Sequence, residues 1–226
     1  MSRAVERLGG IVIPPGAYRP HHSAISAFTD IGQGAGLATT GGLRPLLPLI
    51  TVGVMAHEDA GVDFSGTDWS WMESWVFIGI LAAVFIGFWL VDRLGRSNPV
   101  RPSGRPPEAG LPYVVLSAAA GALLFAGSLA DGGETSWPGL VAGAVAGLIG
   151  YLALARFFVR ANRRLTAAGD PGVVLGLGRD ALTIVLTVVI VLLDPLGYAV
   201  LLAALALLAT ARRREGEKYE GLRILR

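Results

Sequence analysis

Four long stretches without a charged side chain constrain the fold of this chain most strongly. They are residues 74–91, 111–130, 136–155 and 195–211. An α-helix rises 1.5 Å per residue, so about 20 apolar residues cross the hydrocarbon core of a bilayer. The composition agrees, because 53% of residues are hydrophobic and 16% are charged, whereas soluble domains carry about 25% charged residues. The sequence therefore predicts an all-α integral membrane protein.

Two further apolar stretches, residues 30–56 and 173–193, carry charges within them. The charged residues inside them are Asp30, Arg44, Arg179 and Asp180. Intramembrane charges are costly, so they are expected to face a partner, a cavity or water. With these two stretches included, we expect six transmembrane helices within one domain over residues 26–211.

Lys and Arg gather in every second connecting segment. Of 19 in total, 17 lie in residues 1–25, 93–108, 156–172 and 212–226. The other connecting segments, 57–73, 131–134 and 194, contain no Lys or Arg but hold eight acidic residues, namely Glu58, Asp59, Asp63, Asp68, Glu73, Asp131, Glu134 and Asp194. Cytoplasmic loops are enriched in Lys and Arg. We therefore expect a multi-pass protein with a cytoplasmic leader (1–25) and a basic cytoplasmic tail (212–226).

Because the basic residues are concentrated on one side of the expected membrane, they reflect its orientation, and we expect no nucleic-acid partner. An Arg-rich cytoplasmic face attracts anionic lipid headgroups, at about 1 kcal/mol per residue. Three tryptophans, Trp69, Trp71 and Trp75, fall where the second span would meet the outer interface, which is the position that such rings prefer.

Three weak internal matches bear on whether the six spans form two repeated halves. Gly42-Leu43 with Leu47 and Leu49 matches Gly147-Leu148 with Leu152 and Leu154, and Leu90-Val91-Asp92 matches Leu192-Leu193-Asp194. The third match pairs Tyr113, Val115, Leu116, Ala118 and Ala119 with Tyr198, Val200, Leu201, Ala203 and Ala204. Such matches fit two inverted three-helix halves. They equally fit six unrelated helices of similar Ala/Leu/Gly composition.

The first span contains the residues least expected in a membrane. A Thr-Thr-Gly-Gly run precedes Arg44 and Pro45, and this pattern predicts a broken helix whose second half starts there. Arg44 would lie roughly 18 Å from residue 56, near mid-membrane. A helix N-terminus beside Arg44 would favour an anionic ligand. The candidate substrate-binding residues are Asp30, Thr39, Thr40, Gly41, Gly42, Arg44 and Asp180.

Asp180 and Asp30 are the candidate counter-charges for Arg44, and Asp180 is the preferred one. Arg179 and Asp180 point about 100° apart on a helix, so each needs its own partner. Arg179 lies closer to the cytoplasmic side, where its side chain can reach water. The alternative interpretation is that Arg44 pairs with a carboxylate or with helix carbonyls and merely locks the bundle.

Gly139, Gly143 and Gly147 form a GxxxGxxxG ridge that lets a neighbouring backbone approach closely. We favour packing within the chain over a homodimer or another membrane partner. No catalytic set, metal-ligand cluster or cofactor motif is recognisable, and the chain has no Cys. We therefore expect neither an enzyme nor a metal or cofactor protein.

Residues Gly42-Leu43-Arg44-Pro45, followed by Leu46-Leu47-Pro48-Leu49-Ile50, resemble the bacterial membrane proteins catalogued as domain of unknown function 4126. The tail Lys218-Tyr219-Glu220-Gly221-Leu222-Arg223 is similar to the ends of those proteins. The resemblance covers most of the chain from about residue 25. It implies a small polytopic protein of the bacterial cytoplasmic membrane and assigns no site residue.

Buried charge beside an interrupted helix is typical of discontinuous helices that bind substrate in transporters. We therefore expect a small transporter or flippase-like protein that binds an anionic group near Arg44. The alternative is a membrane scaffold, or a subunit of a larger complex, that packs through its Gly ridge and basic face.

Overall fold

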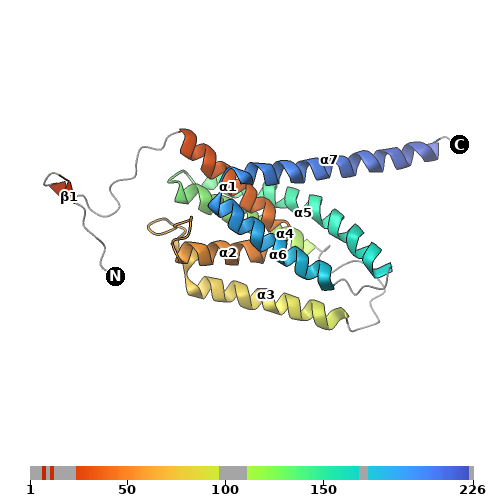
Figure 1. Ribbon diagram of the computed structural model, residues 1–226, viewed down its shortest axis with the longest axis horizontal. Coiled ribbons are helices and arrows are strands. Elements are labelled where there is room, and N and C mark those ends of the chain that lie inside the picture. Colours follow the sequence, from red (N-terminus) through yellow and green to blue (C-terminus); the bar gives the residue numbers. More distant parts are fainter. Residues whose placement is uncertain (1–6, 9–10, 13–23, 97–110, 168–172, 224–226) are drawn as a thin grey trace.

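The computed structural model describes residues 7–8, 11–12, 24–96, 111–167 and 173–223, and these form an all-helical fold with one two-residue ladder (Figure 1). The ladder pairs β1 (Arg7–Leu8) with β2 (Ile11–Val12) in antiparallel fashion. In chain order the helices are α1 (Ala24–Gly41), α2 (Leu46–His57), the 3-10 helix η1 (Ser70–Glu73), α3 (Trp75–Arg96), α4 (Leu111–Asp131), α5 (Trp137–Ala167), α6 (Val173–Leu192) and α7 (Leu196–Arg223).

Helices α3 to α7 each begin within one residue of an expected span. The agreement arises because turn residues and charges bound the uncharged runs at these points. The helices then continue past the expected ends on the basic side. In particular, α7 runs through the basic residues to Arg223, so the expected boundary between the last span and a tail at residue 211 falls inside one helix.

Residues 30–56 do not form one broken span; they form two helices that run in opposite directions (Figure 1). Near the start of α1, the carbonyl of Phe28 accepts a 2.8 Å hydrogen bond from the Tyr198 hydroxyl, just after the α6–α7 turn. The loop after α2 reaches the same end of the bundle, where the Asp63 amide donates to Asp131 Oδ1 at 3.1 Å. We call α1 and α2 the hairpin.

The hairpin changes the expected topology. The start of α1 and the end of α2 lie at the end of the bundle that holds the acidic loops, which we call the acidic end. The last residues of α7 lie at the opposite end (Figure 1). The described helices therefore do not reproduce the expectation that both termini leave on one side. The leader, residues 1–25, lies almost entirely outside the described residues.

Helix α1 occupies the centre of the bundle and packs against α4, α5, α6 and α7. Small residues make this possible. A Cβ at Gly36 would overlap the backbone of Gly197 at the start of α7, so these two helices touch through their backbones. The core around α1 contains Leu37, which is 1% exposed, packed with apolar residues of α2, α4 and α6.

The glycine ridge of α5 lies against α4. A Cβ at Gly143 would overlap the carbonyl of Gly121, and one at Gly147 would overlap the carbonyl of Ser117. One at Gly139 would lie 2.9 Å from the Cα of Ala126. Helix α4 of the same chain therefore covers the ridge.

Two of the three proposed internal matches fall on unlike elements, and the third pairs Tyr113 and Tyr198 near the starts of α4 and α7. Gly42-Leu43 lies in the turn of the hairpin, whereas Gly147-Leu148 lies within α5. Likewise, Leu90-Val91-Asp92 lies inside α3, whereas Leu192-Leu193-Asp194 marks the end of α6. The inverted repeat is therefore not supported, because Ala/Leu/Gly helices match one another by composition alone.

Among the described residues, one helix is long and apolar enough to cross a membrane, namely α4. Four other segments are apolar but shorter: Leu46–His57, Trp75–Leu90, Trp137–Ala153 and Leu196–Ala211. Many large apolar side chains are also exposed, including Val76, Leu111 and Val141, which are 73%, 75% and 63% exposed. Contiguous exposed apolar surface marks a contact with lipid or another protein.

Candidate functional site

Arg44 and Asp180, which are 136 residues apart in sequence, form an ion pair. Arg44 Nε donates to Asp180 Oδ1 at 2.6 Å, and Nη2 lies 3.5 Å from Oδ2. The side chains are 13% and 17% exposed, respectively. The structure thus brings together the two residues that sequence reasoning preferred as a pair, and each neutralises the other in a largely desolvated place.

The turn of the hairpin holds Arg44 in position. Its backbone is closed by hydrogen bonds from the Gly42 amide to the Thr39 carbonyl and from the Leu43 amide to the Thr40 carbonyl. A Cβ at Gly42 would overlap the backbone of Gly150 and Tyr151 on α5. The turn therefore rests directly on α5, and only a glycine at position 42 allows that approach.

Thr39 and Thr40, whose position just before Arg44 and Pro45 would suit residues that cap a helix start, do not cap α2. Both are fully buried, and their hydroxyls donate back into α1, to the carbonyls of Ala35 and Leu37. Pro45 takes the N-cap position of α2, with no side-chain hydrogen bond to cap it. Gly41 closes α1 and packs near Gly121. These residues shape the turn instead of offering polar groups to a ligand.

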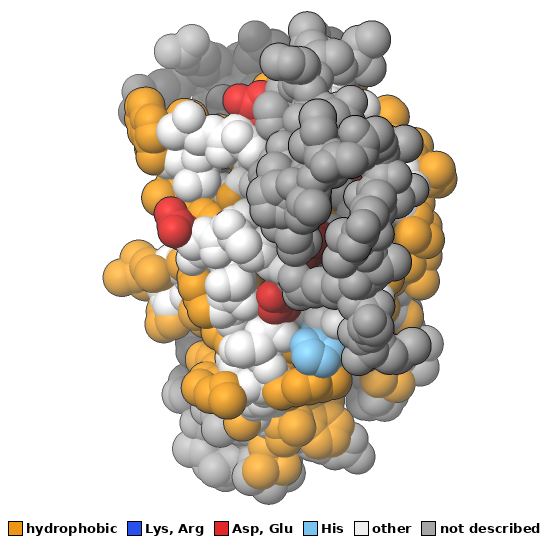
Figure 2. All heavy atoms as spheres, turned by 90° about the vertical axis from the view of Figure 1, so that its left-hand side faces the viewer, with side chains coloured by type: hydrophobic (Ala, Val, Ile, Leu, Met, Phe, Trp, Pro, Cys, Tyr) orange, Lys and Arg blue, Asp and Glu red, His pale blue; other side chains and the backbone are white. Residues whose placement is uncertain are grey.

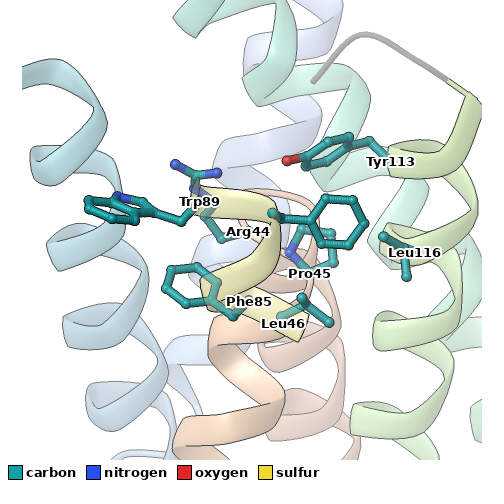
Figure 3. Close-up of a pocket in the computed structure, with 8 residues that line it drawn as sticks. Arg44, Pro45, Leu46, Phe85, Trp89, Tyr113 and Leu116 are labelled. Atoms are coloured by element: carbon teal, nitrogen blue, oxygen red, sulfur yellow. The ribbon is translucent and has the colours of Figure 1, made fainter. Parts of the chain in front are cut away.

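Beside the ion pair lies a hollow with aromatic walls (Figure 3). The tip of the hairpin forms its floor, and α3 and α4 form its two sides. Its lining residues are Arg44, Pro45, Leu46, Phe85, Phe88, Trp89, Tyr113 and Leu116. The rings of Phe88 and Tyr113 are neighbours in its lining, with centroids 6.1 Å apart and ring planes tilted by 55°. In Figure 3 the Tyr113 hydroxyl points toward the side where Arg44 lies.

The hollow is narrow but open at its rim. Its cavity volume is about 20 Å³, which is room for about one water. Phe88 and Trp89 are 39% and 41% exposed, however, so its outer wall faces the surroundings of the protein. Among the described elements, the backbone of α3 lies nearest to those of α2 and η1. The hollow is therefore open to the side at Phe88 and Trp89, and Arg44 is the charged residue in its lining.

Asp30 does not belong to this site. It lies eleven residues before Gly41, so about 16 Å of helix separate it from the turn. Its carbonyl accepts a hydrogen bond from the Ser128 hydroxyl at 2.9 Å, and its carboxylate lies against Gly132. The expectation that Asp30 could neutralise Arg44 is therefore wrong, because α1 is one continuous helix that carries Asp30 to the acidic end, far from the turn that holds Arg44.

A second polar cluster, which sequence reasoning missed, surrounds Gln33 at the acidic end. The buried amide of Gln33 donates to Asp194 Oδ1 at 2.9 Å, and its oxygen accepts from the Ser128 hydroxyl at 2.8 Å. Burial raises the pKa of the Asp194 carboxyl above its ordinary value, and the hydrogen bond from Gln33 opposes that shift. Figure 2 shows this end of the molecule, where acidic side chains and a histidine appear among the coloured atoms.

A polar stripe on α6 leads from the ion pair toward the acidic end. Arg179, Thr183 and Thr187 follow at intervals of four residues, and each is at most 8% exposed. The threonine hydroxyls donate to the carbonyls of Arg179 and Thr183, both at 2.8 Å. Because Arg179 is buried, the expected extension of its side chain into water does not occur.

No group of three or more His, Asp or Glu side chains that could hold a metal ion is found among the described residues. No family model, curated protein or solved structure matches the chain. The interpretation of the site therefore rests on its own geometry and chemistry, and the family resemblance stays a prediction.

Proposed function

We propose that this chain is a polytopic membrane protein that binds the anionic headgroup of a lipid at Arg44 and moves that lipid in a flippase-like manner. In this proposal α3 to α7 cross the bilayer, and the hairpin enters it from the acidic side and turns back. The basic connections lie on the cytoplasmic side of a bacterial plasma membrane. The hairpin thus replaces the single broken span expected from sequence, which leaves five full crossings.

The surface of the bundle supports placement in a bilayer. Exposed apolar side chains are spread over α3, α5, α6 and α7, where a soluble bundle would present charges. At the acidic end, Trp71 and Trp75 are 43% and 58% exposed. Trp71 packs edge-on against Phe77, and Trp75 packs against His57. Such amphipathic rings suit the interface between headgroups and acyl chains.

The depth of Arg44 supports a role in binding. The twelve residues of α2 rise about 18 Å from the turn to the acidic end, so Arg44 would lie within a hydrocarbon core about 30 Å thick. A charged side chain at such depth costs free energy of insertion, and for this reason charged residues inside a membrane usually mark a functional site. The ion pair with Asp180 offsets part of this cost.

The single observation that carries the proposal is the juxtaposition of Arg44 with the laterally open aromatic hollow between α3 and α4. An amphipathic ligand needs a cation for its phosphate and apolar walls for its chains. The guanidinium of Arg44 matches a phosphate in charge and fork geometry. Phe85, Phe88 and Leu116 offer the apolar walls, which a free inorganic anion would not require.

Lipid movement in reconstituted vesicles tests this proposal. Fluorescent phosphatidylglycerol in the inner leaflet is protected from dithionite until it crosses, and fluorescent phosphatidylcholine serves as the neutral control. We expect the chain to speed the crossing of phosphatidylglycerol and the double variant Arg44→Gln/Asp180→Asn to lose at least tenfold of that rate. The double variant removes both charges together, so no buried charge is left unpaired. Equal rates for the chain and the double variant would refute the proposal, as would rates no faster than those of empty vesicles.

The scaffold alternative has less support. One of its two docking surfaces was the ridge of Gly139, Gly143 and Gly147, and α4 covers that ridge; the other was the basic face. A partner that remains bound in stoichiometric amount through purification would nevertheless favour a scaffold over a transporter.

A further inference from the structure

The ion pair itself stands in the way of an anionic ligand. Arg44 offers Asp180 the edge formed by Nε and Nη2, with contacts of 2.6 and 3.5 Å. This is the fork-like edge that a phosphate diester would also use. A headgroup that binds there replaces the Asp180 carboxylate, so the two anions compete for one guanidinium.

The displaced carboxylate would remain poorly solvated. Its side chain is 17% exposed while paired. The elements packed on α6 are α1, α2 and α7, and among their described side chains the titratable groups are Asp30, His57 and Tyr198. All three lie at the acidic end, with Asp30 against Gly132 and Tyr198 against Phe28.

Arg179, the neighbour of Asp180, is the other charged residue of α6. It projects about 100° away around the helix, and it heads the buried stripe with Thr183 and Thr187. It therefore leaves the helix in a different direction from Asp180 and would have to move out of this stripe to take the place of Arg44. Desolvation without a counter-charge disfavours the charged form of a carboxylate.

We propose that Asp180 takes up one proton when an anionic lipid headgroup replaces it on Arg44, so that lipid binding is coupled to protons. This inference rests on the proposed function. The balance is simple, because the carboxylate gains a proton, the phosphate diester is unchanged, and no covalent bond to the lipid forms. The site holds one positive and one negative charge before the exchange, and it does so again afterwards. Loading the site with lipid therefore changes no net charge within the bundle.

Calorimetry of the purified chain in detergent tests the coupling. The probe is short-chain phosphatidylglycerol below its micelle concentration, whose single negative charge does not titrate near neutral pH. Binding enthalpies are measured at pH 6 in buffers of different ionisation enthalpy, and the slope gives the protons taken up per lipid. We expect about one proton for the chain itself. For Asp180→Asn we expect none, together with binding that is tighter by about tenfold because the competing carboxylate is gone.

The variant Arg44→Gln/Asp180→Asn is the matched control, and it separates the two proposals. If the chain and this variant bind phosphatidylglycerol equally, the lipid site at Arg44 is refuted and the coupling with it. If binding needs Arg44 but the chain takes up no proton, the coupling alone is refuted. The same conclusion follows if Asp180→Asn takes up as many protons as the chain, because the proton would then go elsewhere. Far-ultraviolet circular dichroism and elution volume check that each variant is folded.

Discussion

Gln33 on α1 and Asp194 in the α6–α7 turn are joined by a 2.9 Å hydrogen bond from Nε2 to Oδ1, across 161 residues of sequence. The same amide accepts from Ser128 on α4. One side chain therefore fixes the start of the hairpin to two other parts of the bundle. A buried amide with both ends engaged is specific in its geometry, because a lost partner leaves a desolvated polar group.

Asp194 should make stability depend on pH. A carboxyl whose pKa is raised in the folded state binds its proton more tightly there than in the unfolded chain. Its contribution to stability is therefore fully present below about pH 4, the unfolded pKa, and is lost as pH rises through the folded pKa. We expect Asp194→Asn to be more thermostable than the parent at pH 7.5 and to match it at pH 4, since the Asn oxygen still accepts from Gln33. Thermal unfolding in detergent between pH 4 and 8 measures this, and a constant difference across the range would contradict it.

Arg44 and Asp180 should be strongly coupled in stability. Neutralising one partner leaves the other charge buried, which costs about 3–5 kcal/mol. We expect Arg44→Gln and Asp180→Asn each to lower the free energy of unfolding by about this amount, and the double variant to lower it by much less than their sum. A double-mutant cycle from denaturant unfolding gives the coupling energy, and additive single effects would mean that the contact contributes nothing to stability.

The glycines of α5 and α3 should respond in opposite ways to an added methyl group. At Gly143 a Cβ would overlap the Gly121 backbone, whereas at Gly79 nothing lies within 4 Å. We expect Gly143→Ala to cost about 1–3 kcal/mol through overpacking. Gly79→Ala should be neutral or should stabilise α3 by up to about 1 kcal/mol. Unfolding of both variants in the same detergent makes the comparison, and equal effects would mean that α4 and α5 are less closely packed than described.

The hairpin predicts which parts of the chain face the same side of a membrane. The chain has no cysteine, so single cysteines can be placed at Ser26, Ser65 and Ala167. Ser26 and Ser65 border the acidic end, and Ala167 ends α5 at the opposite end. In oriented vesicles an impermeant thiol reagent should label the first two from one side and the third from the other. If Ser26→Cys is labelled from the same side as Ala167→Cys, the hairpin is contradicted, and residues 30–56 would cross the membrane once, as the sequence predicted.

The positions of most helices could be predicted from sequence, because a charge-free run bounded by acidic and basic residues has few alternatives. The contact between Arg44 and Asp180 could be anticipated for a similar reason. Charges are rare inside apolar segments, and Asp180 is one of few candidates that could neutralise Arg44.

The direction of the chain after Gly41 could not be predicted in the same way. Hydropathy is the same whether α2 continues α1 or returns beside it, so the Thr-Thr-Gly-Gly run indicated a break but not a reversal. That reversal returns α2 to the acidic end, where α1 begins. The hollow was also missed, because Phe88 and Tyr113 become neighbours only through the packing of α3 near α4, for which Ala/Leu-rich helices carry no distinct signal.

The central place of α1 has a consequence for how the protein is made. Helices α4 to α7, which enclose α1, all follow it in the chain. Asp180 follows Arg44 by 136 residues, so at about 5–20 residues per second Arg44 leaves the ribosome roughly 7–27 s before its counter-charge. Until then the hairpin lacks its ionic partner, and the parts of its surroundings that α6 and α7 supply are missing, although α4 and α5 have already been made. The first helices to be synthesised are therefore the last that can reach their final place, and a nascent chain that stops before α6 holds an unfinished core.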